Sequence, residues 1–258
     1  MATSGPSQRT VIFVAFTGEE SGLTGSKRYA GAGSPWPASQ AIGMVNLDTV
    51  GRLFGGKILV LGSNSASEWI HIVNGAGYVT GAPVEAVMND PGGSDQKSFI
   101  EIGVPAVQLF TGANADYHRP GDTADKIDGA GLVKVAAVTR ELVAYLAERA
   151  EPLTAKLASG ASPTAAPAAG ERRVSLGSIP DYAFPGPGVR ITGTTPGSPA
   201  EKAGLQQGDV IVKLGEAATN SMRDFSEALK ALAPGAKVTV TYQRDGQTRT
   251  AEATLVAR

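Results

Sequence analysis

A stretch rich in alanine, proline, serine and glycine divides this chain into two regions with different residue patterns. It covers residues 151–171 and contains no aromatic side chain, a composition typical of a flexible or semi-extended linker. Before it, apolar runs alternate with helical segments, whereas after it short strand-like segments follow one another closely. The last two of these segments, residues 237–244 and 247–256, predict a hairpin around Asp245-Gly246. In a chain of 258 residues, this organisation predicts two domains, residues 1–150 and residues 172–258, joined by the linker.

The first region predicts a layered α/β domain. Its continuous apolar runs, rich in β-branched and aromatic residues, are typical of strands buried on both faces of a sheet. Segments with apolar residues three and four positions apart predict amphipathic helices between these strands, and such an alternation packs helices in layers against a sheet. The predicted strands are residues 11–16, 41–48, 57–61, 83–87 and 104–110, and the predicted helices are residues 23–30, 65–75, 94–102 and 131–149.

The composition narrows the classes of function. The chain has no cysteine, which excludes disulfides, thiolate zinc sites and a cysteine nucleophile. Any metal must therefore be held by carboxylates and by the two histidines, His71 and His118, and we expect His71 to be structural. A net charge near −1 gives no reason to expect nucleic acid as a partner. No long apolar run and no signal peptide are found, so we expect no transmembrane segment in this chain.

Acidic and imidazole side chains follow three of the predicted strands. Glu19 and Glu20 come after the first strand, Asp48 ends the second, and Tyr117 and His118 lie in the segment after the last. Ligands of open α/β sheets bind at the carboxyl ends of the strands, so one crevice is expected to collect these side chains. Carboxylates gathered in this way repel one another unless a cation lies between them, and carboxylate and imidazole ligands suit zinc.

Two other interpretations of these acids stay open. A pair of glutamates before a helix is often only a favourable charge at the helix N-terminus, and a single aspartate is often a turn or cap residue. An unrelated acidic α/β protein that binds Mg²⁺ or Ca²⁺ also uses carboxylates, although a histidine ligand argues for zinc.

Four sequence blocks in the first region carry a family resemblance. In chain order they are FVAFTGEESGLTGSKRYA, MVNLDTVGR, GGSDQKSFIEIGVPAVQLFTG and DYHRPGDTADKID. Together they resemble the blocks of M28 metallopeptidases over residues 9–150. The resemblance implies an incomplete three-layer α/β zinc-peptidase domain with a mixed sheet.

The same resemblance assigns roles to individual residues. It implies that Glu19 is the general base that activates a water molecule between two zinc ions. Glu20 and His118 would bind one zinc ion and Asp48 the other, while Tyr117 would donate a hydrogen bond to the tetrahedral oxyanion. Two further aspartates in the last block are candidates for support of these ligands: Asp122 and Asp125.

The family pattern is incomplete in this chain. Family members use two further ligands, a histidine in a His-x-Asp motif and an aspartate that bridges both metals, and both come from segments before the first predicted strand. Gln96 also stands where similar proteins often carry histidine. We therefore expect a truncated catalytic domain that binds zinc poorly, and the alternative function is a fragment that acts only through its second domain.

The second region resembles a bacterial PDZ domain of the kind found in secreted and periplasmic proteases. The block GVRITGTTPGSPAEKAGLQQGDVIVKLGEAATNSMRDFSEALKALAPGAKVTVTYQRDGQ carries this resemblance. PDZ domains add an extended peptide to a sheet edge and bind its terminal carboxylate through main-chain N–H groups. Pro180 lacks such a group and is expected to shorten the groove. The residues expected to bind the peptide are Ser175, Leu176, Gly177, Ser178 and Ile179, with Leu229 as a candidate for the side-chain pocket.

These observations predict a zinc-dependent aminopeptidase with an attached peptide-binding domain. The expected partners are peptide substrates and a C-terminal peptide ligand of the PDZ domain. The expected location of the full-length protein is the periplasm or the outside of the cell.

Overall fold

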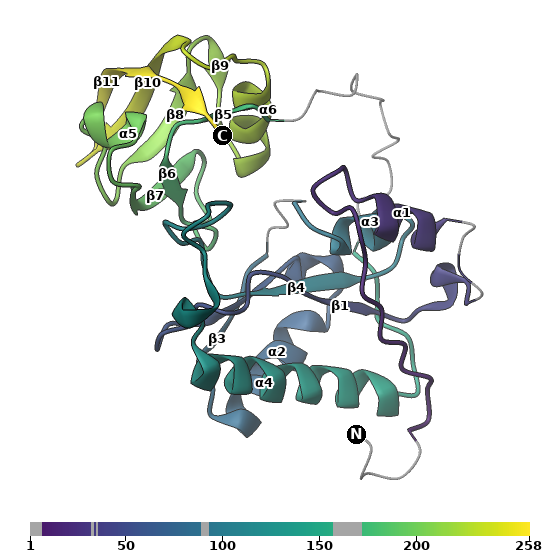
Figure 1. Cartoon of the computed structure of the whole chain (residues 1–258). Coiled ribbons are helices and arrows are strands. Elements are labelled where there is room, and N and C mark those ends of the chain that lie inside the picture. Colours follow the sequence, from purple (N-terminus) through teal and green to yellow (C-terminus); the bar gives the residue numbers. More distant parts are fainter. Residues whose placement is uncertain (1–6, 32–33, 35, 89–92, 157–171) are drawn as a thin grey trace. The chain divides into compact units, whose positions relative to one another are not determined.

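The computed structural model describes residues 7–31, 34, 36–88, 93–156 and 172–258 (Figure 1). The chain forms two compact units. The first contains Met1–Gly112 and Thr123–Ser159, and the second contains Ala113–Asp122 and Gly160–Arg258. A search of the described residues finds no helix with the length and hydropathy needed to span a bilayer.

A mixed sheet forms the middle layer of the first unit. In its described part, the strands run in the order β1 (Met44–Leu47), β4 (Ala106–Phe110), β2 (Ile58–Leu61), β3 (Val84–Ala86). β1 is parallel to β4, β4 is antiparallel to β2, and β2 is parallel to β3. All residues of β4 are buried, which confirms that its apolar run is a central strand covered on both faces.

Helices cover both faces of this sheet (Figure 1). On one face lie α2 (Trp69–Thr80) and α4 (Gly129–Glu148), whose apolar sides form the main core with the sheet. On the other face lie α1 (Thr24–Ala30) and α3 (Gln96–Glu101), which enclose a smaller apolar cluster. The three-layer mixed-sheet prediction is therefore confirmed. The short 3-10 helices of this unit are Ala38–Gln40, Ser63–Ser65 and Ala124–Lys126.

The ends of α2 and α4 show why these helices form where they do. Ser63–Ser65 forms a 3-10 turn, so α2 begins at Trp69, four residues after the predicted start at residue 65. Asp128 caps α4, because its carboxylate accepts hydrogen bonds from the Gly131 N–H at 2.9 Å and the Phe54 N–H at 2.8 Å. These two backbone hydrogen bonds hold the pKa of Asp128 below its usual value.

The prediction of a buried strand at residues 11–16 is wrong. No strand is assigned there, and Phe13 is 84% exposed. An apolar run becomes a buried strand only where a neighbouring strand takes up its backbone N–H and C=O groups and other elements cover its faces. Contacts hold the chain just before the run and at its end: the Arg9 N–H donates to the Ala147 carbonyl at 3.1 Å, and Phe16 packs edge-on against Tyr29.

The beginning of the expected linker is part of the first unit. Leu153 is buried in the main core, and Ala155 forms a β-bridge with Ala66. The Thr154 N–H and hydroxyl both donate to the Glu68 carboxylate, at 3.0 and 2.9 Å. Residues 150–156 therefore pack on the first unit, while the remainder of the predicted linker, residues 157–171, lies outside the described residues.

An antiparallel sheet forms the core of the second unit. Its strands run in the order β11 (Gln247–Thr254), β10 (Lys237–Arg244), β8 (Val210–Leu214), β7 (Val189–Thr194), β6 (Ser178–Pro180), and β9 (Ala217–Ala218) pairs with β8. β5 (Val174–Ser175) pairs separately with β12 (Val256–Ala257). The helices are α5 (Pro199–Lys202) and α6 (Met222–Lys230).

Local sequence signals set the elements of the second unit. Ser198 and Ser221 cap α5 and α6, because their hydroxyls accept from backbone N–H groups at 3.2 Å. Asp245 and Gly246 both have positive φ, 52° and 75°, as a two-residue hairpin turn requires. The predicted hairpin between β10 and β11 is therefore confirmed. The buried Asp209 carboxylate is paired with the Arg244 guanidinium at 2.6 Å.

Candidate functional site

The loop with Glu19 and Glu20 is closely joined to the start of α1. The Glu19 carbonyl accepts from the Gly22 N–H at 3.1 Å and the Leu23 N–H at 2.8 Å, and the Gly25 N–H donates to the Thr17 carbonyl at 2.9 Å. A Cβ atom on Gly25 would lie 2.5 Å from that carbonyl oxygen, so only glycine allows this approach. The two glutamates are thus held on a tight turn, with Glu19 half-buried and Glu20 exposed.

Asp48 lies directly after β1, and an unusual backbone turn follows it. Thr49 has φ +54°, a left-handed conformation that is rare for a β-branched residue. Its hydroxyl donates to the Asp48 carboxylate at 3.1 Å. Its carbonyl accepts from the N–H and the hydroxyl of Thr111, at 3.1 and 2.8 Å. These bonds hold a strained residue beside Asp48, a feature that is common at functional sites.

Tyr117 and His118 lie in Ala113–Asp122, the segment that groups with the second unit. Their rings stack with centroids 3.9 Å apart, and His118 also has a left-handed backbone, with φ 57°. The His118 Nδ1 atom contacts the guanidinium group of Arg258 within the second unit. The segment is shaped by a turn in which the Arg119 N–H donates to the Asp116 carbonyl at 2.9 Å.

Asp122 and Asp125, which follow His118 in the sequence, are both exposed. The Asp122 N–H donates to the Arg119 carbonyl at 3.0 Å, so Asp122 belongs to the same turn. Asp125 lies in the 3-10 helix before α4, and hydrogen bonding to the Thr123 side chain holds its pKa below the usual value.

The predicted ligands are divided between the units. Glu20 and Asp48 belong to the first unit and His118 to the second. Among the described residues, no three His, Asp or Glu side chains gather closely enough to hold a metal ion. The donor types, carboxylate oxygen and imidazole nitrogen, nevertheless suit zinc.

A buried polar cluster lies near Asp48 and was missed by the analysis of the sequence. Asn46 on β1, Gln108 on β4 and Gln96 at the start of α3 have exposed fractions of 8%, 5% and 0%. Their amides are hydrogen bonded to one another at 3.0 Å. Asn46 and Gln108 each interrupt an apolar strand run, which was the signal available in the sequence.

The predicted peptide-binding residues lie at the edge of the second unit's sheet. Gly177 has φ +77°, and a Cβ atom there would lie 2.2 Å from the Ser198 Cβ. Its N–H donates to the Ser175 hydroxyl at 3.1 Å, and Leu176 is fully buried. Ser178 and Ile179 belong to β6, the last strand in the sheet order.

Pro180 ends β6, and the pairing of β6 with β7 shifts register between Ile179 and Pro180. A strand at the end of a sheet offers backbone groups to an added peptide, and Pro180 has no N–H to contribute. Leu229 of α6 is fully buried and belongs to the apolar core of this unit.

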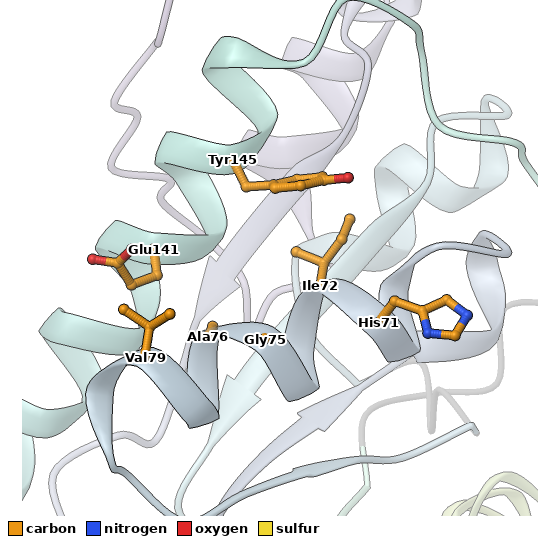
Figure 2. Close-up of a pocket in the computed structure, with 7 residues that line it drawn as sticks. All are labelled: His71, Ile72, Gly75, Ala76, Val79, Glu141 and Tyr145. Atoms are coloured by element: carbon orange, nitrogen blue, oxygen red, sulfur yellow. The ribbon is translucent and has the colours of Figure 1, made fainter.

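A shallow pocket of about 320 Å³ lies between α2 and α4 of the first unit (Figure 2). His71 is at one end and points away from the Tyr145 ring, which extends over Ile72. The Tyr145 hydroxyl accepts from the Arg149 guanidinium at 3.2 Å. The pocket is on the helical face opposite α1 and α3, and it contains none of the predicted site residues. Its lining consists of His71, Ile72, Gly75, Ala76, Val79, Glu141 and Tyr145.

Comparisons with known protein families give one match in each half of the chain. Residues 1–143 match the sequence model of Peptidase family M28, and residues 164–255 match that of the PDZ domain. The chain is similar in fold to part of BSAP, a zinc aminopeptidase from Bacillus subtilis, with a TM-score of 0.50 and 23% identity, over 59% of this chain and 40% of that one.

Curated relatives match over a shorter stretch. The Do-like serine protease HtrA of Lactococcus lactis is 43% identical over 68 residues, which is 26% of this chain and 17% of that protein. The serine endoprotease DegS of Haemophilus influenzae is 42% identical over 60 residues, 23% of this chain and 18% of that protein. The chain thus spans less than a fifth of the length of these relatives.

Proposed function

Because the chain belongs to Peptidase family M28, we propose that it contributes to zinc-dependent hydrolysis of N-terminal peptide bonds, as an aminopeptidase with a PDZ domain. The observation that carries this proposal is the family match over residues 1–143, which includes every residue that the resemblance assigns to the chemistry. The zinc-binding residues in this proposal are Glu20, Asp48 and His118, around two ions.

The roles of the other residues follow from their chemistry. Bound zinc would supply Lewis acidity, which polarises the scissile carbonyl and makes water a better nucleophile. Glu19 would accept a proton from the attacking water and return it to the leaving amine. Tyr117 would donate a hydrogen bond to the oxygen that gains negative charge. Asp122 and Asp125 would help to orient the loop that carries His118.

The test of this activity is the hydrolysis of aminoacyl-p-nitroanilides by the whole chain with added zinc. We expect Glu19→Gln to lower kcat by about 10²–10⁴-fold, the usual contribution of a general base. The matched control is Glu101→Gln, which alters a carboxylate on the exposed end of α3. A wild-type rate that a chelator does not reduce, or a Glu19→Gln rate equal to the control, would refute the proposal.

A second candidate function is peptide capture by the PDZ domain alone. The left-handed Gly177 and the position of β6 at the end of the described sheet order favour it. In this function Ser175, Leu176, Gly177, Ser178 and Ile179 would receive the C-terminal carboxylate and the last side chain of a peptide.

A fluorescent peptide with a free C-terminus tests this capture, with the C-terminally amidated peptide as the control. We expect only the free carboxylate to bind, and we expect Gly177→Val to abolish binding, because its Cβ would overlap Ser198. Equal binding of the two peptides would exclude carboxylate recognition.

The organisation of the full protein is part of the same proposal. We place the peptidase domain in residues 1–150 and the PDZ domain in residues 172–258, with a linker between them. Because similar PDZ domains occur in Do-like proteases, we place the protein outside the cytoplasm, and fractionation of cells that express the full-length protein checks this location.

A further inference from the structure

A row of buried amide side chains joins the start of α3 to β1 and β4, close to Asp48. The Asn46 Nδ2 atom donates to the Gln96 Oε1 atom at 3.0 Å, and the Gln96 Nε2 atom donates to the Gln108 Oε1 atom at 3.0 Å. Asn46 Nδ2 also donates to the Ser94 hydroxyl at 2.9 Å. We call Asn46, Gln96 and Gln108 the amide row.

The amide row lies at one end of the described sheet order. β1 is an end strand with a ladder of four residues on β4, in which Asn46 pairs with Gln108. The ladder weakens toward its carboxyl end, because the Asp48 N–H is 3.4 Å from the Leu109 carbonyl oxygen. Leu47 is 46% exposed, so packing adds little at this point.

Gln96 is the central member of the row because it accepts from one strand and donates to the other. Burying an amide side chain costs free energy unless it is hydrogen bonded. Apolar side chains at these three positions would fill the same space without that cost. A fully satisfied polar row fixes relative positions more narrowly than apolar packing does. Asp48 follows the end of β1 and lies two residues after Asn46, so a displacement of Asn46 moves Asp48.

We propose that Gln96 is a positioning residue that holds the carboxyl end of β1, and with it Asp48, against β4. The inference rests on the proposed function, because the role of Asp48 as a zinc ligand belongs to that function. It extends that function, because it assigns a task to a residue that lies outside the expected ligand set.

Gln96→Met tests the inference in the whole chain, because methionine has a similar volume and no hydrogen-bonding amide. We expect hydrogen exchange of the Asp48 amide to become about tenfold faster, as follows from the loss of buried hydrogen bonds. We expect zinc affinity, measured by titration calorimetry, to fall about 10–100-fold. Gln96→His should restore both values, because a neutral imidazole retains one acceptor and one donor.

The control variant is Ser26→Ala, which breaks the buried 2.9 Å hydrogen bond between the hydroxyls of Ser26 and Ser98. This bond joins α1 to α3 on the same side of the sheet but does not reach β1. Its loss should leave exchange at Asp48 unchanged. Gln108→Met breaks the row at its other end and serves if Gln96→Met does not fold.

The outcomes separate the inference from the proposed function. Unchanged exchange at Asp48 in both Gln96→Met and Gln108→Met, or equal acceleration in Ser26→Ala, overturns the positioning role of Gln96. A wild-type chain that takes up no zinc, while exchange responds as expected, overturns the zinc assignment and leaves the structural role of the row in place.

Discussion

Two apolar runs in the first unit have similar compositions and very different environments. β4, Ala106–Phe110, pairs with strands on both sides, and all its residues are buried. Residues 11–16 form no strand, and Ile12, Phe13 and Val14 are 45%, 84% and 42% exposed. The contrast shows that apolar character gives a segment the capacity to be a strand, while neighbouring strands and helices determine whether it becomes one.

Replacing a large side chain by alanine should give the largest difference in stability between the two runs. Leu109 is fully buried in the main core, so we expect Leu109→Ala to lower the free energy of unfolding by about 3 kcal/mol. The matched change Phe13→Ala should stay within about 0.5 kcal/mol, because that ring is largely exposed.

Tryptophan fluorescence during urea denaturation measures this difference in the first unit. Both tryptophans of the chain, Trp36 and Trp69, belong to that unit, and the buried Trp69 reports its core. Equal losses of stability in the two variants would show that residues 11–16 are packed in solution.

A hydroxyl group introduced into each run tests the same contrast with a smaller effect. Val107 is fully buried and Val14 is 42% exposed. We expect Val107→Thr to cost about 1–2 kcal/mol, because the buried hydroxyl loses its water partners. Val14→Thr should be neutral within about 0.5 kcal/mol. The same urea denaturation measures both, and a neutral Val107→Thr would contradict the buried position of β4.

Acid should weaken the packing of α4 on the sheet that contains β4. We expect no comparable effect on residues 11–16. The folded-state pKa of Asp128 is lowered by hydrogen bonds from Gly131 and Phe54. Its contribution is therefore present above its ordinary pKa near 3.8 and is lost as the pH falls through the lower folded value. We expect the urea midpoint of unfolding to fall as the pH falls over that range. In Asp128→Asn this midpoint should fall less steeply with pH. A slope that is unchanged by this substitution would exclude Asp128 as the group responsible.

The sequence alone predicted the elements that depend on local pattern. The spacing of Val135, Val138 and Leu142 placed α4 correctly, and the Asp245-Gly246 pair placed the β10–β11 hairpin. Residues 11–16 were mistaken for a buried strand, because periodicity carries no information about whether a partner strand is present.

The candidate site was predictable only where it depends on local sequence order. The position of Asp48 after a strand follows from the order of residues along the chain. The left-handed Thr49 and the Gln96–Gln108 hydrogen bond depend on contacts between segments 62 and 12 residues apart. Neither feature leaves a periodic signal in the sequence. A polar residue inside an apolar strand was nevertheless a clue to the Gln96–Gln108 hydrogen bond.

The fold-back of residues 150–156 has a mechanical consequence. A pull applied to the chain beyond Lys156 acts first on Lys156, whose N–H donates to the Ser65 carbonyl at 2.9 Å. The force is then shared by the Ala66–Ala155 bridge and by the bonds of Thr154 to Glu68. Such a pull should therefore detach residues 150–156 before it disturbs the last turn of α4.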